Sequence, residues 1–158
     1  MPPLDIGPEC DDNPAMPSEP SPSIYTRIAG RLSTFGGPDD SGVTPRETCA
    51  LYPTVLCRQL GTRLFTRHYC AMRWDYQATA LACKCSRSQA VQFIRDQTIY
   101  LFRTDRPNEL ATWAWPADWG PAPATGRLID VSPIILEELD LQTDDLVIVE
   151  LDPLIKLR

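Results

Sequence analysis

The stretch from Trp115 to Pro133 limits the possible folds more than any other part of this sequence. It reads WPADWGPAPATGRLIDVSP and contains two carboxylates, Asp118 and Asp130, each at the end of a strand-like run. A Gly/Pro-rich loop joins the two runs. After Asp130, Ser132 is a good helix cap and Pro133 suits the first helical turn. Two strands that both end in Asp, with a capped helix behind the second, are unusual in a purely structural segment, so we look for function here.

The rest of the chain shows short apolar runs bounded by turn residues, which predict short strands. Strands are expected at 24–35, 64–76, 98–102, 110–115 and 145–151, with a hairpin turn at 105–108. Segment 78–85 fits either a strand or a short buried helix. Helices are expected at 86–96 and 134–139. Because no βαβ rhythm is present, the pattern predicts a mainly β protein, a small closed barrel with short helices, and not a doubly wound sheet.

The chain has a one-domain length of 158 residues and begins with a segment of different composition. Residues 1–23 contain seven prolines and no periodicity, which predicts an extended Pro-rich arm. The arm is expected either to wrap around its own barrel or to dock onto a neighbouring subunit. The barrel domain is expected to span 24–158.

Charge and hydropathy exclude several functions. The net charge is −6, which argues against binding to a phosphate backbone, so no nucleic-acid partner is expected. No apolar run is long enough to span a bilayer, so no membrane partner is expected. The first residues have neither the basic nor the apolar region of a signal peptide. We therefore expect a protein that stays in the cytoplasm until it is released, for example as a virion component freed by lysis.

The six cysteines leave three interpretations open: buried free thiols, one or more disulfides, or a metal site. Cys83 and Cys85, with Cys57, His68 and Cys70 upstream, lack the paired Cys-x2-Cys turns of common zinc modules, so no metal is expected. In a strand, Cys83 and Cys85 would share a face and be poorly placed to bond to each other. His68 and Cys70 would also share a strand face, but no orienting partner for catalysis is evident.

Several motifs together resemble the double-psi β-barrel of the rare lipoprotein A family, which is related more distantly to expansins and family 45 endoglucanases. The motifs are Asp118-Trp-Gly-Pro121, Gly126-Arg-Leu-Ile-Asp-Val-Ser132 and Ser33-Thr-Phe-Gly-Gly37, with Glu47 roughly where the family has a Glu. The match extends over 98–151 and implies a six-stranded double-psi β-barrel. Residues 53–96 have no counterpart and are interpreted as an insertion. Trp119 replaces the family's usual Arg, and the family's early His is missing.

The resemblance implies a groove that binds a glycan strand of peptidoglycan, without a cofactor. Asp130 corresponds to the family's acid, Asp118 to its partner, and Glu47 to a weaker third candidate. A lytic transglycosylase needs only one carboxyl group, which protonates the glycosidic oxygen and then takes a proton from the sugar's 6-hydroxyl. An inverting hydrolase would need two carboxylates about 6.5–9.5 Å apart.

Each of these residues also has a structural interpretation. Asp130 fits a loop-holding Asp before a helix, and Asp118 fits a turn before Gly120-Pro121. Trp119, Arg127 and Trp115 are the candidate substrate-binding residues. Arg127 is alternatively an ion-pair partner of Asp118 or Asp130, which would keep that carboxylate ionised.

The tryptophans also allow two interpretations. Trp113 and Trp115 share one strand face and are more typical of core packing than of a sugar-stacking platform. Trp119 is left open because it is expected in a loop.

Two functions follow. The first is a protein that binds and cleaves peptidoglycan glycan strands, with Asp130 as the acid. The second is a non-catalytic structural component of a bacteriophage tail or baseplate, in which the arm joins the barrel to other subunits of the assembly.

Overall fold

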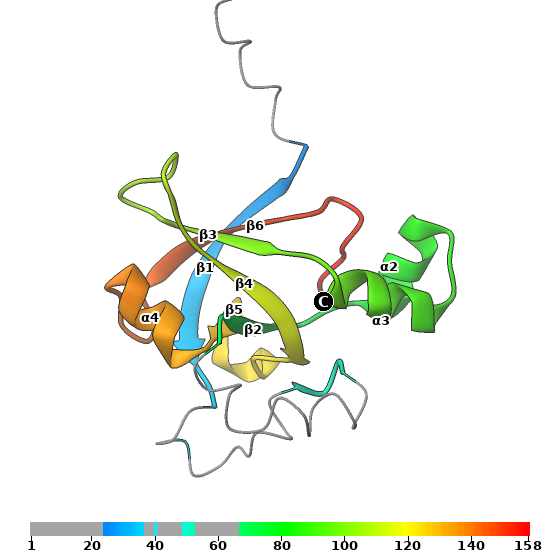
Figure 1. Ribbon diagram of the computed structural model, residues 1–158, viewed down its shortest axis with the longest axis horizontal. Helices are drawn as coiled ribbons and strands as arrows, with labels where there is room; N and C mark the ends of the chain where they lie inside the picture. The colour runs from blue at the N-terminus through cyan, green and yellow to red at the C-terminus, as the bar shows by residue number, and fades with distance from the viewer. Residues whose placement is uncertain (1–23, 37–39, 41–48, 53–66) are drawn as a thin grey trace, which may run out of the picture.

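The computed structural model describes residues 24–36, 40, 49–52 and 67–158, and in this part of the chain six strands close into a barrel (Figure 1). Around the barrel the strands follow the order β1-β5-β2-β4-β3-β6. They are β1 (Thr26–Thr34), β2 (Tyr69–Met72), β3 (Ile99–Arg103), β4 (Leu110–Trp119), β5 (Ile129–Val131) and β6 (Leu146–Leu151). The mainly β barrel of six strands that the sequence predicted is confirmed.

Most strands that are neighbours in the barrel are far apart in the sequence. β1 pairs in parallel with β5 and antiparallel with β6, and β2 pairs in parallel with β4 and antiparallel with β5. β3 closes the barrel by antiparallel pairing with β4 and β6. The three-residue β5 is therefore held on both edges, and it is the strand that carries Asp130.

The side chains of β5 alternate between the barrel interior and its outer face. Ile129 and Val131 are fully buried in the main core, whereas Asp130 between them is only partly buried. Because successive side chains of a strand point to opposite faces, Asp130 points outward. On the neighbouring β2, Cys70 and Met72 are in the core, so Ala71 also faces outward.

β1 approaches the segment that leads into β5 very closely at Gly30. A Cβ atom at this position would lie 2.5 Å from the Cβ of Leu128. The backbone N–H of Leu128 also donates to the carbonyl oxygen of Arg31 at 2.8 Å. The missing side chain of Gly30 thus allows β5 to dock against β1.

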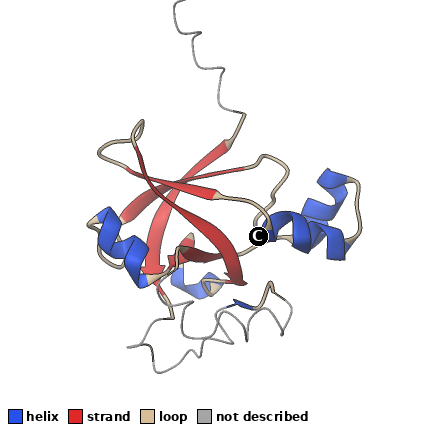
Figure 2. Cartoon of the chain, viewed as in Figure 1, coloured by secondary structure: helices blue, strands red, loops and turns tan. Residues whose placement is uncertain are grey.

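Figure 2 shows that the helices lie outside the barrel, with α2 and α3 together on one side and α4 on the opposite side. Their bounds are Tyr76–Cys83 for α2, Arg87–Arg95 for α3 and Pro133–Leu139 for α4, with a short 3-10 turn at Pro123–Thr125. Asp75 caps α2, and Ser86 forms a capping box with Gln89 at the start of α3. α4 begins at Pro133 as expected, but the Ser132 hydroxyl makes no cap hydrogen bond and instead accepts one from the Tyr69 N–H at 3.4 Å.

The largest differences from the predicted elements lie between 64 and 119. Of the described residues of the expected strand 64–76, only Tyr69–Met72 form a strand, and residues 64–66 lie outside the described part of the chain. The segment 78–85 takes the helical alternative up to Cys83, the last residue of α2. β4 continues past Trp115 to Trp119, with a register shift against β2 that leaves Ala117 unpaired between Pro116 and Asp118. β2 lies inside the range 53–96 that was interpreted as an insertion, so this range supplies one of the barrel's own strands.

Among the helices of the described residues, none is both long enough and apolar enough to cross a membrane. The Pro-rich arm, residues 1–23, lies outside the described residues.

Candidate functional site on the outer face of the barrel

Four residues form a row across the outer face of β1, β5, β2 and β4. Ser33 pairs with Asp130, Asp130 pairs with Ala71, and Ala71 pairs with Asp118. Residues directly opposite each other in a sheet project from the same face. The two aspartates of the opening motif are therefore brought to one face, separated by two strand spacings, which corresponds to about 9–10 Å between backbones.

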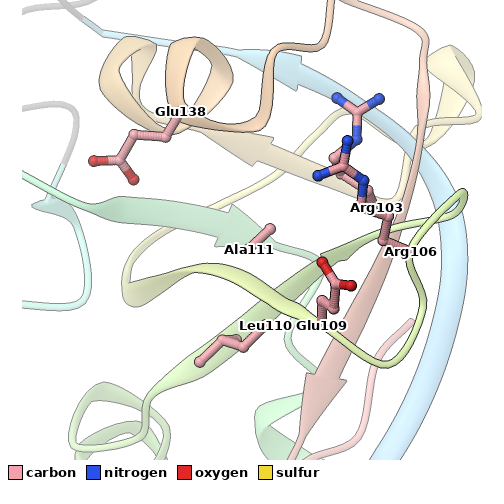
Figure 3. Close-up of a pocket in the computed structure, with 6 residues that line it drawn as sticks. All are labelled: Arg103, Arg106, Glu109, Leu110, Ala111 and Glu138. Atoms are coloured by element: carbon pink, nitrogen blue, oxygen red, sulfur yellow. The ribbon is translucent and has the colours of Figure 1, made fainter.

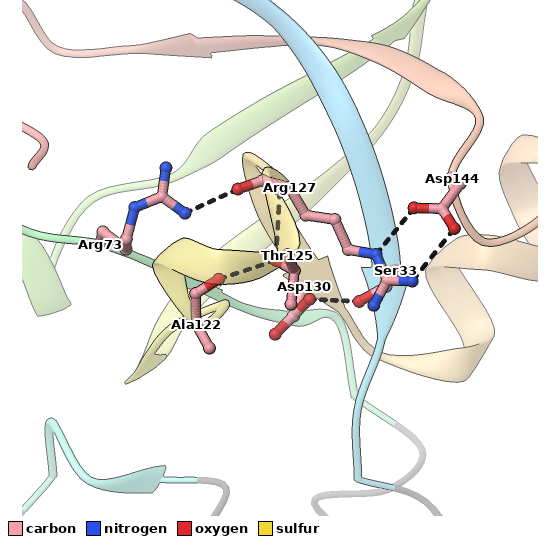
Figure 4. A network of polar contacts seen from close by, with 7 residues as sticks. All are labelled: Ser33, Arg73, Ala122, Thr125, Arg127, Asp130 and Asp144. Atoms are coloured by element: carbon pink, nitrogen blue, oxygen red, sulfur yellow. Dashed lines mark hydrogen bonds and ion pairs between the residues drawn. The ribbon is translucent and has the colours of Figure 1, made fainter.

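The Asp130 carboxylate is partly enclosed by β1 and by the loop before β5 (Figure 4). The Ser33 hydroxyl donates a hydrogen bond to its Oδ1 atom. Its Oδ2 atom lies on the side of Gly120, where a Cβ would be 3.5 Å away. One oxygen is thus engaged by the protein, and the other faces a position without a side chain.

Burial raises the pKa of the Asp130 carboxyl above its ordinary value. The hydrogen bond from Ser33 and the positive charges of Arg127 and Arg73 oppose this effect but do not cancel it. Within the described part of the chain, no lysine or arginine forms an ion pair with Asp130, the Arg127 ion pair being with Asp144. A carboxyl group of this kind is easier to protonate than an exposed aspartate.

Arg127 does not pair with Asp118 or Asp130, contrary to one of the expectations. Its guanidinium binds the Asp144 carboxylate through two hydrogen bonds, Nε to Oδ1 at 2.8 Å and Nη2 to Oδ2 at 3.1 Å (Figure 4). Its carbonyl oxygen accepts a hydrogen bond from Arg73 Nη1 at 2.7 Å. Arg127 therefore joins the loop before β5 to the segment before β6, and it acts on Asp130 only through its charge.

Asp118 makes one hydrogen bond to its neighbour in the chain through its side chain and one to a distant residue through its backbone. Its Oδ1 atom accepts a hydrogen bond from the Trp119 N–H at 2.7 Å. This contact is one residue shorter than the Asx turn expected before Gly120. The Asp118 carbonyl oxygen accepts the indole N–H of the fully buried Trp74 at 2.7 Å. The end of β4 is thereby fixed to the core.

An aromatic cluster lies on the same outer face. Trp115 is partly buried there and packs edge-to-face with Tyr52 (ring centroids 5.2 Å apart) and with Tyr69 (6.3 Å apart). Phe35 contacts Tyr69 in the same way at 5.2 Å. The expectation that Trp115 is a packing residue agrees with this arrangement. Trp119, at the end of β4 and not in a loop, is 40% exposed, and its indole N–H donates to the Trp74 carbonyl oxygen at 3.2 Å.

The core position expected for Trp113 is wrong. Its side chain is 44% exposed, while its neighbour Ala114 occupies the barrel core. The alternation was predicted correctly, but the small side chains face inward and the tryptophans outward. Trp113 stacks on the ring of His68, with centroids 4.9 Å apart and planes at 17°.

His68 belongs to a polar cluster that sequence reasoning missed. Its Nε2 atom lies 2.8 and 2.9 Å from the two carboxylate oxygens of Glu138. The Thr112 hydroxyl donates to the same carboxylate at 2.6 Å. These hydrogen bonds outweigh the opposing effect of burial and hold the pKa of Glu138 below its ordinary value. These residues come together through the parallel pairing of β2 with β4 and the packing of α4 against β4, and no local sequence signal reports either contact.

A shallow pocket of about 200 Å³ lies next to Glu138 (Figure 3). Its lining residues are Arg103, Arg106, Glu109, Leu110, Ala111 and Glu138. The Arg103 guanidinium is already bound by the Asp105 carboxylate at 2.8 and 3.0 Å and by the Leu139 carbonyl oxygen. Because Arg103 is engaged and the pocket also carries two glutamates, we assign no ligand to it.

The described cysteines include both a disulfide-bonded residue and free thiols, two of the three interpretations left open by the sequence. Cys49 is disulfide-bonded to a partner outside the described residues, whereas Cys70, Cys83 and Cys85 are free thiols. Cys70 is fully buried, and burial raises its pKa. In the described part of the chain, no group of three or more potential metal-ligating side chains comes together. The third candidate acid, Glu47, lies outside the described residues.

The fold and site together define a small closed barrel of mixed strand pairing, with a partly buried aspartate and an aromatic cluster on its outer face. Comparison of the chain with protein-family models, with curated proteins and with solved structures finds no match in any of the three.

Proposed function

We propose that this protein binds peptidoglycan glycan strands on the outer face of its barrel and cleaves them in a lytic transglycosylase reaction, with Asp130 as the acid. The observation that carries the proposal is the Asp130 carboxyl, which is partly buried, has a raised pKa and forms no ion pair with any described residue. A general acid needs a carboxyl group that still holds its proton near the working pH.

The resemblance to the rare lipoprotein A family supports the same proposal. The closed barrel contains two parallel strand pairs, as well as antiparallel ones. The two motif segments that carry the resemblance also meet in space, because Gly120 lies beside the Asp130 carboxylate. We therefore propose that the barrel is of the double-psi type.

The reaction would proceed at the Oδ2 atom of Asp130. Protonated Asp130 gives its proton to the glycosidic oxygen as the bond to the anomeric carbon breaks. The resulting carboxylate then takes the proton of the sugar's 6-hydroxyl, whose oxygen closes the anhydro ring on that carbon. Ser33 holds Oδ1, and Oδ2 lies beside Gly120, which has no side chain.

Trp119 is the residue best placed to stack on a sugar ring, since it is exposed at the end of the strand that carries Asp118. Trp115 contributes by supporting this face from within the aromatic cluster. Arg127 would contribute charge rather than a direct contact, because Asp144 occupies its guanidinium.

The direct test compares Asp130→Asn with wild type in the release of muropeptides from purified sacculi. Loss of a general acid typically lowers the rate by about 10²–10⁴-fold. Asp105→Asn is a matched control, because it makes the same change at an exposed residue of the turn between β3 and β4, where the carboxylate binds Arg103. Anhydro-muropeptides from wild type and the control, but not from Asp130→Asn, are expected. Equal release by all three proteins would remove Asp130 from this role.

The alternative is a non-catalytic structural component of a virion tail or baseplate. It is favoured by Ile24 and Tyr25, the two residues that directly follow the Pro-rich arm, whose side chains are 76% and 41% exposed. If the arm docks onto other subunits of the assembly, those subunits would cover the side chains of Ile24 and Tyr25. Deletion of residues 1–23 should then abolish incorporation into particles while the barrel stays folded. Normal assembly without the arm would count against this alternative.

A further inference from the structure

Cys83 and Cys85 meet at the end of α2. Cys83 is the last residue of the helix, and Lys84 follows in the left-handed conformation at φ 54° and ψ 45°. Two hydrogen bonds fix this turn, from the Lys84 N–H to the Leu81 carbonyl oxygen at 3.3 Å and from the Cys85 N–H to the Ala80 carbonyl oxygen at 3.0 Å. The strand alternative for this segment, in which the two thiols would be poorly placed to bond to each other, does not hold, because the helix ends at Cys83 and the chain turns at Lys84.

Both thiols are free and partly exposed, so small molecules have access to them. They differ in chemistry. Burial first, and then the neighbouring Cys85 and Asp152, raise the pKa of Cys83 above its ordinary value. A thiol with a raised pKa forms less thiolate, so Cys83 is the poorer nucleophile of the pair. Because the thiolate is the nucleophile in disulfide chemistry, Cys85 is the attacking sulfur of the pair.

We propose that Cys83 and Cys85 form a redox-active dithiol that exchanges with small-molecule disulfides, a function separate from the proposed glycan site. Two cysteines joined by one residue in a tight turn close a small ring when they are oxidised. Strained or exposed disulfides are the labile ones that take part in exchange, in contrast to buried structural ones.

The exchange proceeds in two balanced steps. The Cys85 thiolate attacks one sulfur of a small disulfide, forming a mixed disulfide and releasing one small thiolate, which takes a proton from solvent. Cys83 then loses its proton and attacks the Cys85 sulfur, which breaks the mixed disulfide and releases the second small thiol. The protein dithiol is oxidised by two electrons, and the small disulfide is reduced to two thiols.

The test uses the full chain with oxidised glutathione as the probe. Trypsin cleaves after Lys84, between the two cysteines, so an 83–85 disulfide leaves the peptides 74–84 and 85–87 linked in a non-reducing digest. We expect wild type to give this linked pair. Cys83→Ser should accumulate a glutathione adduct on Cys85, whereas Cys85→Ser should form its adduct on Cys83 more slowly, because burial still raises the pKa of Cys83 when Cys85 is replaced. Cys70, which is free but fully buried, is the internal control and should stay unmodified in all three proteins.

A second measurement needs no substitution. Pulsed alkylation of the reduced wild-type protein with iodoacetamide should label Cys85 before Cys83. Absence of the linked peptides after incubation with oxidised glutathione would overturn the proposal, as would equal adduct rates on the two variants. Labelling of Cys83 first would overturn the assigned order of attack.

Discussion

Gly30 in β1 gives the most quantitative test of how the candidate site is held together. An added Cβ would lie 2.5 Å from the Cβ of Leu128, 3.0 Å from its Cδ2 and 3.2 Å from its Cγ, whereas ordinary contact begins at 3.4 Å. The nearest atom is attached directly to the Leu128 backbone, so a change of rotamer cannot remove the clash. The segment leading into β5 would have to move on the order of 1 Å, in a molecule whose interior is close-packed.

The expected cost of Gly30→Ala follows from two opposing effects. Overpacking of this kind costs about 1–3 kcal/mol. Replacing glycine by alanine in a strand returns about 0.5–1 kcal/mol of backbone entropy. We therefore expect the free energy of unfolding to fall by about 1–2 kcal/mol, measured by urea unfolding followed through tryptophan fluorescence. Because β5 carries Asp130, muropeptide release should fall as well.

Two substitutions of Leu128 show which atom causes the effect. Leu128→Ala keeps the Cβ and should leave most of the clash, whereas Leu128→Gly removes it. In double-mutant cycles with Gly30→Ala, we expect a coupling energy of about 1 kcal/mol for Leu128→Gly and a much smaller one for Leu128→Ala. A Gly30→Ala protein as stable as wild type, or equal coupling for the two Leu128 variants, would refute the assigned contact.

Three further predictions concern the acids and the core beneath them. Asp130→Asn should raise the free energy of unfolding at neutral pH by about 1 kcal/mol. Burial raises the pKa of Asp130. The contribution of Asp130 to stability is therefore full below the unfolded-state pKa and is lost as pH rises through the folded-state pKa. In a pH series, the free energies of unfolding of wild type and variant should converge in acid. Glu138→Gln should lower the free energy of unfolding by less than about 1 kcal/mol at neutral pH. Since the pKa of Glu138 is lowered, its contribution is present above the unfolded-state pKa and is lost as pH falls through the folded-state pKa, so the variant's stability should depend less on pH in acid. Trp74→Phe removes the donor to the Asp118 carbonyl oxygen and should lower the free energy of unfolding by about 1–3 kcal/mol, measured by thermal unfolding. An unchanged midpoint would contradict the role given to that hydrogen bond.

The barrel could be predicted because most of its strands have a recognisable local sequence pattern. Thr26–Thr34, Ile99–Arg103 and Leu146–Leu151 all lie within a residue or two of the predicted runs. Helix α3 could be predicted because Ala90, Val91 and Ile94 recur on one helical face, and Ala90 and Ile94 are indeed buried. The extension of β4 past Pro116 could not, because it depends on a register shift against β2 that no local pattern encodes.

The candidate site was predicted in part for the same reason. Asp118 and Asp130 stand out through their motif, and the structure brings them to one face. Ser33, the hydrogen-bond donor to Asp130, appears in the sequence only as part of a motif, since its partner is 97 residues away. The pairing of Arg127 with Asp144 could not be predicted, because the sequence pointed only to Asp118 and Asp130 and the path of the loop decides the partner.

The strand order of the barrel also determines when its outer face can exist during folding. The row of Ser33, Asp130, Ala71 and Asp118 draws on four separate stretches of chain, and β1 closes the barrel by pairing Thr26 with Leu151. Contacts between such distant segments slow folding, because each requires a large loop to be closed first. Asp130 therefore acquires its environment only when these distant stretches have paired. A chain without these pairings would carry every residue of the row but neither the hydrogen bond from Ser33 nor the burial that raises the pKa of Asp130.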